Sequence, residues 1–132
     1  MTDLLGGQIP LAFAPIVQII EDVRAGKLIA IGVTTPTRSD AAPNIPAIAE
    51  FVPGYAAAGW YGMCAPAGTP DEIVEKLNAA ISAGVTDPAL KTKLLGQGVE
   101  TVAMPVKEFR KYVADEIAKY AKVINSTGMK VD

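Results

Sequence analysis

The chain has 132 residues, half of them hydrophobic and a fifth charged, with a net charge of −2 and a pI near 5.1. This length suits one domain with a real core. Lysine and arginine are scattered, which argues against nucleic-acid binding, because neutralising phosphates requires a basic face. No apolar run approaches the ~18 residues of a membrane span, and the first ten residues lack the basic and apolar regions of a signal peptide.

The first predicted elements are a strand, a helix and a second strand. Residues 8–14 form an apolar run that predicts a buried strand, and residues 27–35 form another that is typical of a strand covered on both faces. Between them a helix is predicted, with Pro15 near its first position and Gly26 just beyond its end. Its apolar face consists of Ile16, Ile19, Ile20 and Val23. The three elements together predict a right-handed parallel βαβ unit.

The middle of the chain predicts a surface excursion followed by a strand. Residues 36–55 are rich in proline, with a short helical turn expected at 46–51. Residues 56–66 are the next strand candidate, interrupted by two glycines that indicate a bend or a close backbone approach.

Three helices are then expected. The first follows a capping box that runs from Thr69 to Glu72, and Thr69→Ala should cost about 1 kcal/mol. The second begins at Asp87 and Pro88 and ends at Gly96 or Gly98.

After a short edge-like strand at 99–104, the last helix is predicted from about residue 105 to residue 126. Its predicted inward stripe is Val106, Phe109, Val113, Ile117, Tyr120 and Ile124. Asp115 and Lys119 form an expected i,i+4 pair on the exposed side. The order of all these elements predicts the α/β class.

Residues for catalysis are poorly represented. The chain has no histidine, so the commonest general base and metal ligand are missing, and its one cysteine, Cys64, has no base to activate it. A buried structural role is favoured for Cys64. The carboxylates show no ligand-like clustering. We therefore expect no enzyme, no metal and no cofactor. Trp60 and Tyr61 could stack on a ligand, although such a pair is more often core.

A series of short motifs, in order along nearly the whole chain, resembles one family. The motifs are Leu5-Gly6-Gly7-Gln8, Ala25-Gly26-Lys27-Leu28, Val33-Thr34-Thr35, Arg38-Ser39, Pro43-Asn44-Ile45-Pro46, Pro53-Gly54-Tyr55, Ala65-Pro66-Ala67-Gly68-Thr69-Pro70, Ile73 and Leu77-Asn78. They resemble the C-terminal part of the Bug-type solute receptors, which are the extracytoplasmic binding proteins of tripartite tricarboxylate transporters.

The resemblance implies part of a type II periplasmic-binding-protein fold, in which two α/β lobes close on a small organic acid. Residues 1–52 would belong to the second lobe, 53–64 would cross between the lobes, and 65–132 would complete the first lobe. Receptors of this family often carry an acidic residue where Ala14 stands here. The resemblance therefore extends a ligand-binding role only to the backbone of Ala14 and Pro15, with Trp60 as a neighbour of the hinge.

Two functions stay open at this point. The chain would be a periplasmic receptor that binds a carboxylate reversibly and works with the membrane components of the transporter. Alternatively, it would be a self-associating module without a ligand. In the family fold, other parts of the protein supply partner strands, so we expect this chain to form a homodimer that covers its open sheet edges.

Overall fold

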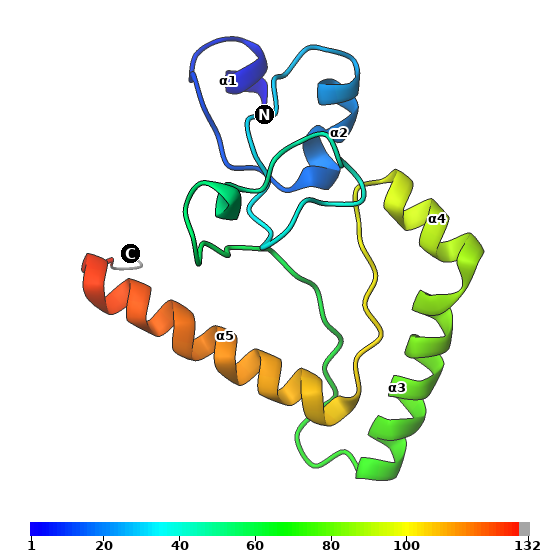
Figure 1. Ribbon diagram of the computed structural model, residues 1–132. Helices are drawn as coiled ribbons and strands as arrows, with labels where there is room; N and C mark the ends of the chain where they lie inside the picture. Colours follow the sequence, from blue (N-terminus) through cyan, green and yellow to red (C-terminus); the bar gives the residue numbers. More distant parts are fainter. Residues whose placement is uncertain (130–132) are drawn as a thin grey trace. The chain divides into compact units, whose positions relative to one another are not determined.

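Helices carry the regular structure of residues 1–129, the part of the chain that this computed structural model describes (Figure 1). In chain order they are α1 (Thr2–Leu5), α2 (Ile16–Arg24), the 3₁₀ turn η1 (Ile48–Glu50), α3 (Asp71–Thr86), α4 (Pro88–Gly96) and α5 (Val106–Thr127). The chain divides into two compact units. Unit 1 comprises residues 1–64 and 86–101, and unit 2 comprises residues 65–85 and the chain from residue 102 onward.

The strands expected from the apolar runs form no ladder within residues 1–129, although the Ala57 amide donates to the Thr34 carbonyl at 3.0 Å. Within residues 1–129 the only recorded bridge is a parallel one between Val33 and Ala47, and no ladder forms over 8–14, 27–35, 56–66 or 99–104. Ile29 is 90% exposed and Ile31 is 71% exposed, so the expected burial of 27–35 on both faces is wrong for the described residues. An apolar pattern favours an extended segment, but a ladder also needs a second strand about 4.8 Å away.

Helix α2 forms where its local signals place it. Pro15 precedes its first residue, and Gly26 follows its last turn with a positive φ of 72°. Ile20 is 4% exposed whereas Val17 is 42% exposed, which confirms the predicted apolar face. Rigid proline geometry at the start and a left-handed glycine after the end are both local features, so the sequence alone reveals them.

The predicted excursion at 36–55 is held by polar contacts around η1, the helical turn expected there. Arg38 binds the carboxylate of Glu50 through two nitrogens, at 2.8 and 2.9 Å, and Glu50 Oε1 also accepts from the Ala47 amide at 2.8 Å. Ala47 is fully buried. Near the start of the excursion, the buried Ser39 hydroxyl donates to Glu100 Oε1 at 2.5 Å, and the Asp40 amide donates to the same oxygen at 2.9 Å.

The start of α3 differs from the predicted capping box. The Thr69 amide and hydroxyl both donate to the carbonyl oxygen of Pro66, at 3.2 and 2.8 Å. The Glu72 carboxylate pairs instead with Lys76, one turn ahead, at 2.8 Å. Both groups of the expected box therefore have other partners, because the preceding turn offers a carbonyl and the helix offers a cation.

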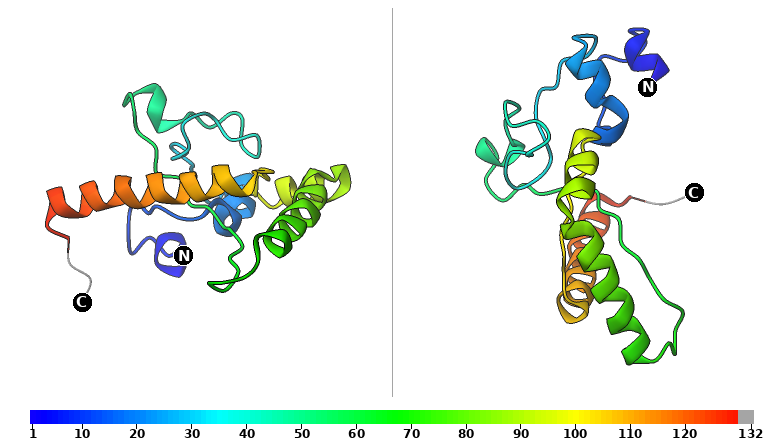
Figure 2. Two further views of the ribbon diagram at one scale, coloured as in Figure 1. Left: turned by 90° about the horizontal axis from the view of Figure 1, so that it is seen from below. Right: turned by 90° about the vertical axis from the view of Figure 1, so that its right-hand side faces the viewer.

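The other two helix ends agree better with expectation. Asp87 caps α4 by accepting from the Leu90 amide at 2.9 Å. Helix α5 ends at Gly128, whose φ of 67° is left-handed, and it runs without a break in the left view of Figure 2.

The side chains of α5 depart from expectation in two ways. Asp115 pairs with Lys111 at 2.5 Å, and Lys119 pairs with Glu116, so the predicted Asp115–Lys119 pair is wrong. The first half of the predicted inward stripe is half-buried, but Ile117, Tyr120 and Ile124 are exposed. Helical periodicity puts these residues on one face, but it does not provide an element to cover that face.

Candidate functional site

The first predicted site residues lie at the start of α2, in unit 1. Ala14 is half-buried, and Pro15 is the N-cap residue, with φ −57° and ψ 132°. Proline has no side-chain acceptor, so no side chain caps this helix, and the Pro15 carbonyl accepts only from the Gln18 amide among the bonds recorded for it. The first-turn amides of Ile16 and Val17 point out of the helix at the positive end of its dipole. Backbone donors in this arrangement suit a carboxylate.

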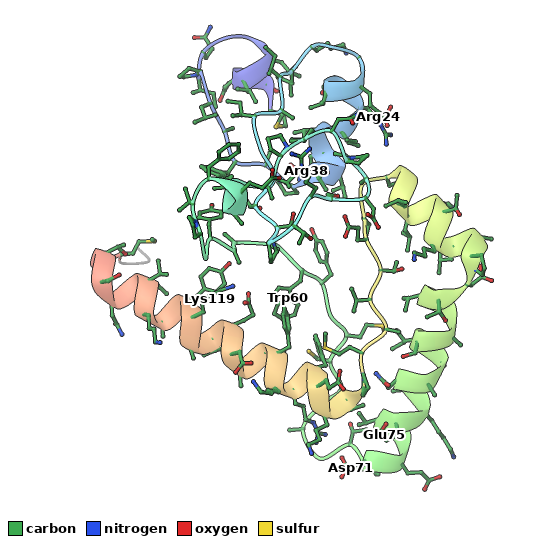
Figure 3. The ribbon with its side chains drawn as sticks, viewed as in Figure 1. Arg24, Arg38, Trp60, Asp71, Glu75 and Lys119 are labelled. Atoms are coloured by element: carbon green, nitrogen blue, oxygen red, sulfur yellow. The ribbon has the colours of Figure 1, made fainter. Side chains whose placement is uncertain are left out.

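A turn that is distant in sequence lies against α2. Gly98 is buried with a φ of +84°, and a Cβ added there would lie 3.2 Å from Ile16 Cγ2 and 3.3 Å from its Cγ1. At the other end of the helix, Arg24 Nη1 donates to the Gly96 carbonyl at 3.0 Å and to Glu21 Oε1 at 2.7 Å (Figure 3). The turn 96–98 therefore contacts both the first and the last residue of α2.

An open cavity of about 440 Å³ lies between α2 and this turn. Its lining residues are Val17, Ile20, Glu21, Tyr61, Gly96, Gln97 and Val99. The volume is within the range of small-molecule sites, roughly 300–1,000 Å³. Valine and isoleucine side chains make much of the wall apolar, and the Glu21 carboxylate would repel an anion. The cavity is therefore better suited to the carbon skeleton of a ligand than to its carboxylate.

Trp60 lies on the irregular segment between η1 and α3 and is 40% exposed (Figure 3). It is not among the residues that line the cavity, whereas its neighbour Tyr61 is. Tyr61 is nevertheless 88% exposed, so it contributes to the open rim. The sequence singled out the aromatic pair but not which ring faces the cavity, because successive residues of an extended segment point to opposite sides. The role of Trp60 near a ligand stays a prediction.

Cys64 is exposed, so the expected buried structural role is wrong. Its segment is extended and forms no ladder within residues 1–129, and the Cys64 side chain is left exposed. Within residues 1–129 there is also no group of three or more cysteine, aspartate or glutamate side chains arranged to hold a metal ion. A search of the same residues found no helix with the length and hydropathy of a membrane span.

One group of titratable side chains lies on α5, in unit 2. Burial raises the pKa of Tyr112, and the nearby Glu116 carboxylate raises it further. The hydrogen bond to Glu116 raises the pKa of Lys119, whose ammonium also lies 4.8 Å from the centre of the Tyr120 ring. These contacts lie along little more than two turns of one helix and act on its charges locally.

The chain matches the family model described as tripartite tricarboxylate transporter family receptor over residues 1–129. It is 31% identical to protein BugT of Bordetella pertussis over 99% of its own length and 40% of BugT. It is 32% identical to a UPF0065 protein of Agrobacterium vitis over 97% of its length and 38% of that protein. The chain thus spans about 40% of the length of these curated relatives.

Two solved structures share the fold. One is R. palustris Rpa4515 with adipate, with a TM-score of 0.83 and 33% identity, over 96% of this chain and 42% of that one. The other, a periplasmic transporter, gives the same score and identity over 98% of this chain and 44% of that one.

These matches confirm the predicted fold class, α/β and part of a periplasmic-binding-protein-type fold, although helices make up nearly all of the regular structure of the described residues. They also confirm the resemblance noted in the sequence. The matching family consists of transporter receptors and is not an enzyme family. This chain belongs to the tripartite tricarboxylate transporter receptor family.

Proposed function

We propose that this chain is part of a solute-binding receptor that reversibly binds a small organic acid, whose carboxylate lies against the first turn of α2. The observation that carries the proposal is the helix start after Ala14 and Pro15, where no side chain caps the amides. The fold is shared with a receptor solved with adipate, which supports an acid as the ligand.

The proposed chemistry is binding without reaction. The Ile16 and Val17 amides donate charge-assisted hydrogen bonds to the carboxylate, and the helix dipole adds about 0.3–1 kcal/mol. The carbon skeleton extends beside Val17 into the open cavity, where it displaces water from apolar side chains. Ala14 has no charge that would repel the anion.

The wider setting of the site is part of the same proposal. Residues 1–52 belong to the second lobe, 53–64 cross between lobes, and 65–132 complete the first lobe, with lobe closure burying the ligand. Residues 86–101 pack with residues 1–64 in unit 1, so we expect this stretch to move with the second lobe during closure. The receptor acts in the periplasm and delivers its acid to the membrane components of the transporter. Membership of the receptor family supports this setting.

Calorimetric titration with adipate, benzoate and glutamate at pH 7 tests the proposal, with adipamide as an uncharged control. Ile16→Pro is the decisive variant because it deletes the Ile16 amide at a position where proline suits a helix and where Pro15 already has a compatible ψ of 132°. Ile16→Ala is the matched control, because it shortens the same side chain but keeps the amide.

We expect Ile16→Pro to bind the acid about 10-fold or more weakly than Ile16→Ala, since a hydrogen bond to a charged group contributes about 1.5–3 kcal/mol. Equal affinities of the two variants would place the carboxylate elsewhere. No binding of any acid by the unmodified chain would contradict the proposed function itself.

A second candidate function is favoured by the exposed apolar segments. Ile29 and Ile31 are 90% and 71% exposed on a segment without a ladder, and Leu11 and Phe13 are 60% and 76% exposed on another. Unpaired extended segments with exposed apolar side chains favour association. We propose on this ground that the chain self-associates as a homodimer, with or without a ligand.

Sedimentation equilibrium tests self-association. We expect a dimer at micromolar concentration that Ile29→Lys shifts towards monomer, because a charge on the open segment opposes pairing. Glu72→Lys, on the exposed side of α3, is a control that should leave the mass unchanged. A stable monomer at high concentration would contradict this second candidate.

A further inference from the structure

We infer that the turn 96–98 positions the ligand-facing end of α2, with Gly98 as a positioning residue that contacts no ligand. This inference rests on the proposed function, since it concerns the same first-turn amides. It adds a determinant of affinity about 80 residues away from them in sequence.

The contact at Gly98 leaves little room for a side chain, because a neighbouring atom would have to shift to admit one. Gly98 is buried against Ile16, and an added Cβ would meet both the side chain of Ile16 and its carbonyl carbon, at 3.2 to 3.6 Å. Ile16 carries the first of the proposed donor amides. Any group larger than hydrogen at residue 98 therefore pushes on the residue whose amide direction sets the carboxylate geometry.

The other end of α2 is fixed to the same turn. Arg24 donates to the Gly96 carbonyl at 3.0 Å, and its second bond, to Glu21, holds the guanidinium in place. The turn is itself tied to the end of α4, because the Gly98 and Val99 amides donate to Leu95 and Leu94 at 2.9 Å. With one contact at each end, α2 cannot tilt without breaking a contact to residues 96–98.

Gly54 provides a matched control for the backbone. Its φ of +83° is nearly the same as that of Gly98, it also lies in unit 1, and a Cβ added there would meet nothing within 4 Å. Alanine at either position carries the same left-handed strain. Only Gly98→Ala also pushes on α2.

The experiment measures adipate affinity by calorimetry and the Val17 and Gln18 amide signals by ¹⁵N NMR, in the unmodified chain, Gly98→Ala and Gly54→Ala. We expect Gly98→Ala to weaken adipate binding by about 3-fold or more, and to shift both signals, because hydrogen bonds lose strength as they are misdirected. Gly54→Ala should change neither measurement.

A rescue variant separates positioning from general damage. Ile16→Ala removes the two side-chain carbons that the new Cβ would meet, so Gly98→Ala should no longer weaken binding when it is made in the Ile16→Ala background. A purely structural effect of the strained backbone would persist there.

The outcomes distinguish this inference from the proposed function. The inference is overturned if Gly98→Ala leaves adipate affinity unchanged, or if Gly54→Ala weakens adipate binding as much as Gly98→Ala does. Neither result contradicts the proposed site. If the unmodified chain binds no adipate, the proposed site fails for that acid. In that case the NMR signals decide on the positioning role. Unchanged Val17 and Gln18 signals in Gly98→Ala overturn it, whereas shifts seen in Gly98→Ala but not in Gly54→Ala support it.

Discussion

The two compact units differ in what holds each of them together. All of the buried residues within 1–129 lie in unit 1, namely Ile20, Ser39, Ala42, Ala47 and Gly98. The described residues of unit 2 are all half-buried or exposed, and most of the ion pairs recorded for them join neighbouring turns of one helix. Unit 1 instead uses hydrogen bonds between residues 60 to 72 positions apart. The stability of unit 1 is therefore tertiary, whereas that of unit 2 is largely local.

The largest effect expected from this difference is at the core of unit 1. Ile20→Ala should lower the free energy of unfolding by about 2–5 kcal/mol, because it leaves a cavity at a residue that is 4% exposed. Leu77→Ala in unit 2 should cost about 1 kcal/mol, since Leu77 is already 49% exposed. Urea unfolding followed by the fluorescence of Trp60, which lies in unit 1, and by helical circular dichroism measures both. Equal losses of unfolding free energy in Ile20→Ala and Leu77→Ala would contradict the difference between the two units.

The next effect is at the link between the excursion and residues 99–101. Ser39→Ala should cost about 1–2 kcal/mol, because the buried hydroxyl donates to the Glu100 carboxylate. Ser126→Ala is a matched control on α5, where the hydroxyl donates to a carbonyl of its own helix and is exposed. We expect that control to change stability by no more than about 0.5 kcal/mol. A Ser39 variant as stable as the Ser126 variant would show that the long-range bond contributes nothing.

A smaller effect compares two helix starts. Asp87→Ala should cost about 1 kcal/mol, because Asp87 caps the Leu90 amide. The Thr69 hydroxyl instead ties the turn before α3, so Thr69→Ala should cost less than about 0.5 kcal/mol. Thermal unfolding of the two variants measures the difference. A larger loss of stability in Thr69→Ala than in Asp87→Ala would support the capping box predicted from the sequence.

The smallest effect on stability is expected at an exposed ion pair, and it is best measured as a pKa. The hydrogen bond from Arg38, together with that from the Ala47 amide, lowers the pKa of Glu50 from 4.5 to about 2. Because the pKa is lowered in the folded state, the stabilisation is fully present above about pH 4.5 and is lost as the pH falls towards 2. Carbon NMR of the Glu50 carboxyl should show its pKa rising towards 4.5 in Arg38→Gln. Arg24→Gln is the control and should leave the titration of Glu50 unchanged. A Glu50 pKa that stays low in Arg38→Gln would show that the hydrogen bond from the Ala47 amide is what lowers it.

The predicted site shows the same division between local and tertiary features. The sequence identified Pro15 as the start of a helix directly after Ala14, and the structure places Pro15 at the N-cap of α2 without a side-chain cap. It did not identify residues 96–98 as neighbours of α2. Gly98 was assigned only as a possible helix stop, and its positive φ is compatible with that assignment. Neither the sequence around Gly98 nor the sequence around Ile16, taken alone, indicates that the two residues are in contact.

By itself, the sequence determined helices α2 to α5 and most of their ends, because the residues that decide them are close together along the chain, but it did not predict the short α1 at Thr2–Leu5. Pro15 and Gly26 bound α2, Asp87 starts α4, and Gly128 ends α5. The family motifs likewise identified the fold class. Only the tertiary structure decided which apolar segments pair, which charges meet and which turn holds α2. Those outcomes depend on the distance in space between residues that are far apart in sequence. An apolar pattern indicates which side chains of a segment can be buried, but not which other segment covers them.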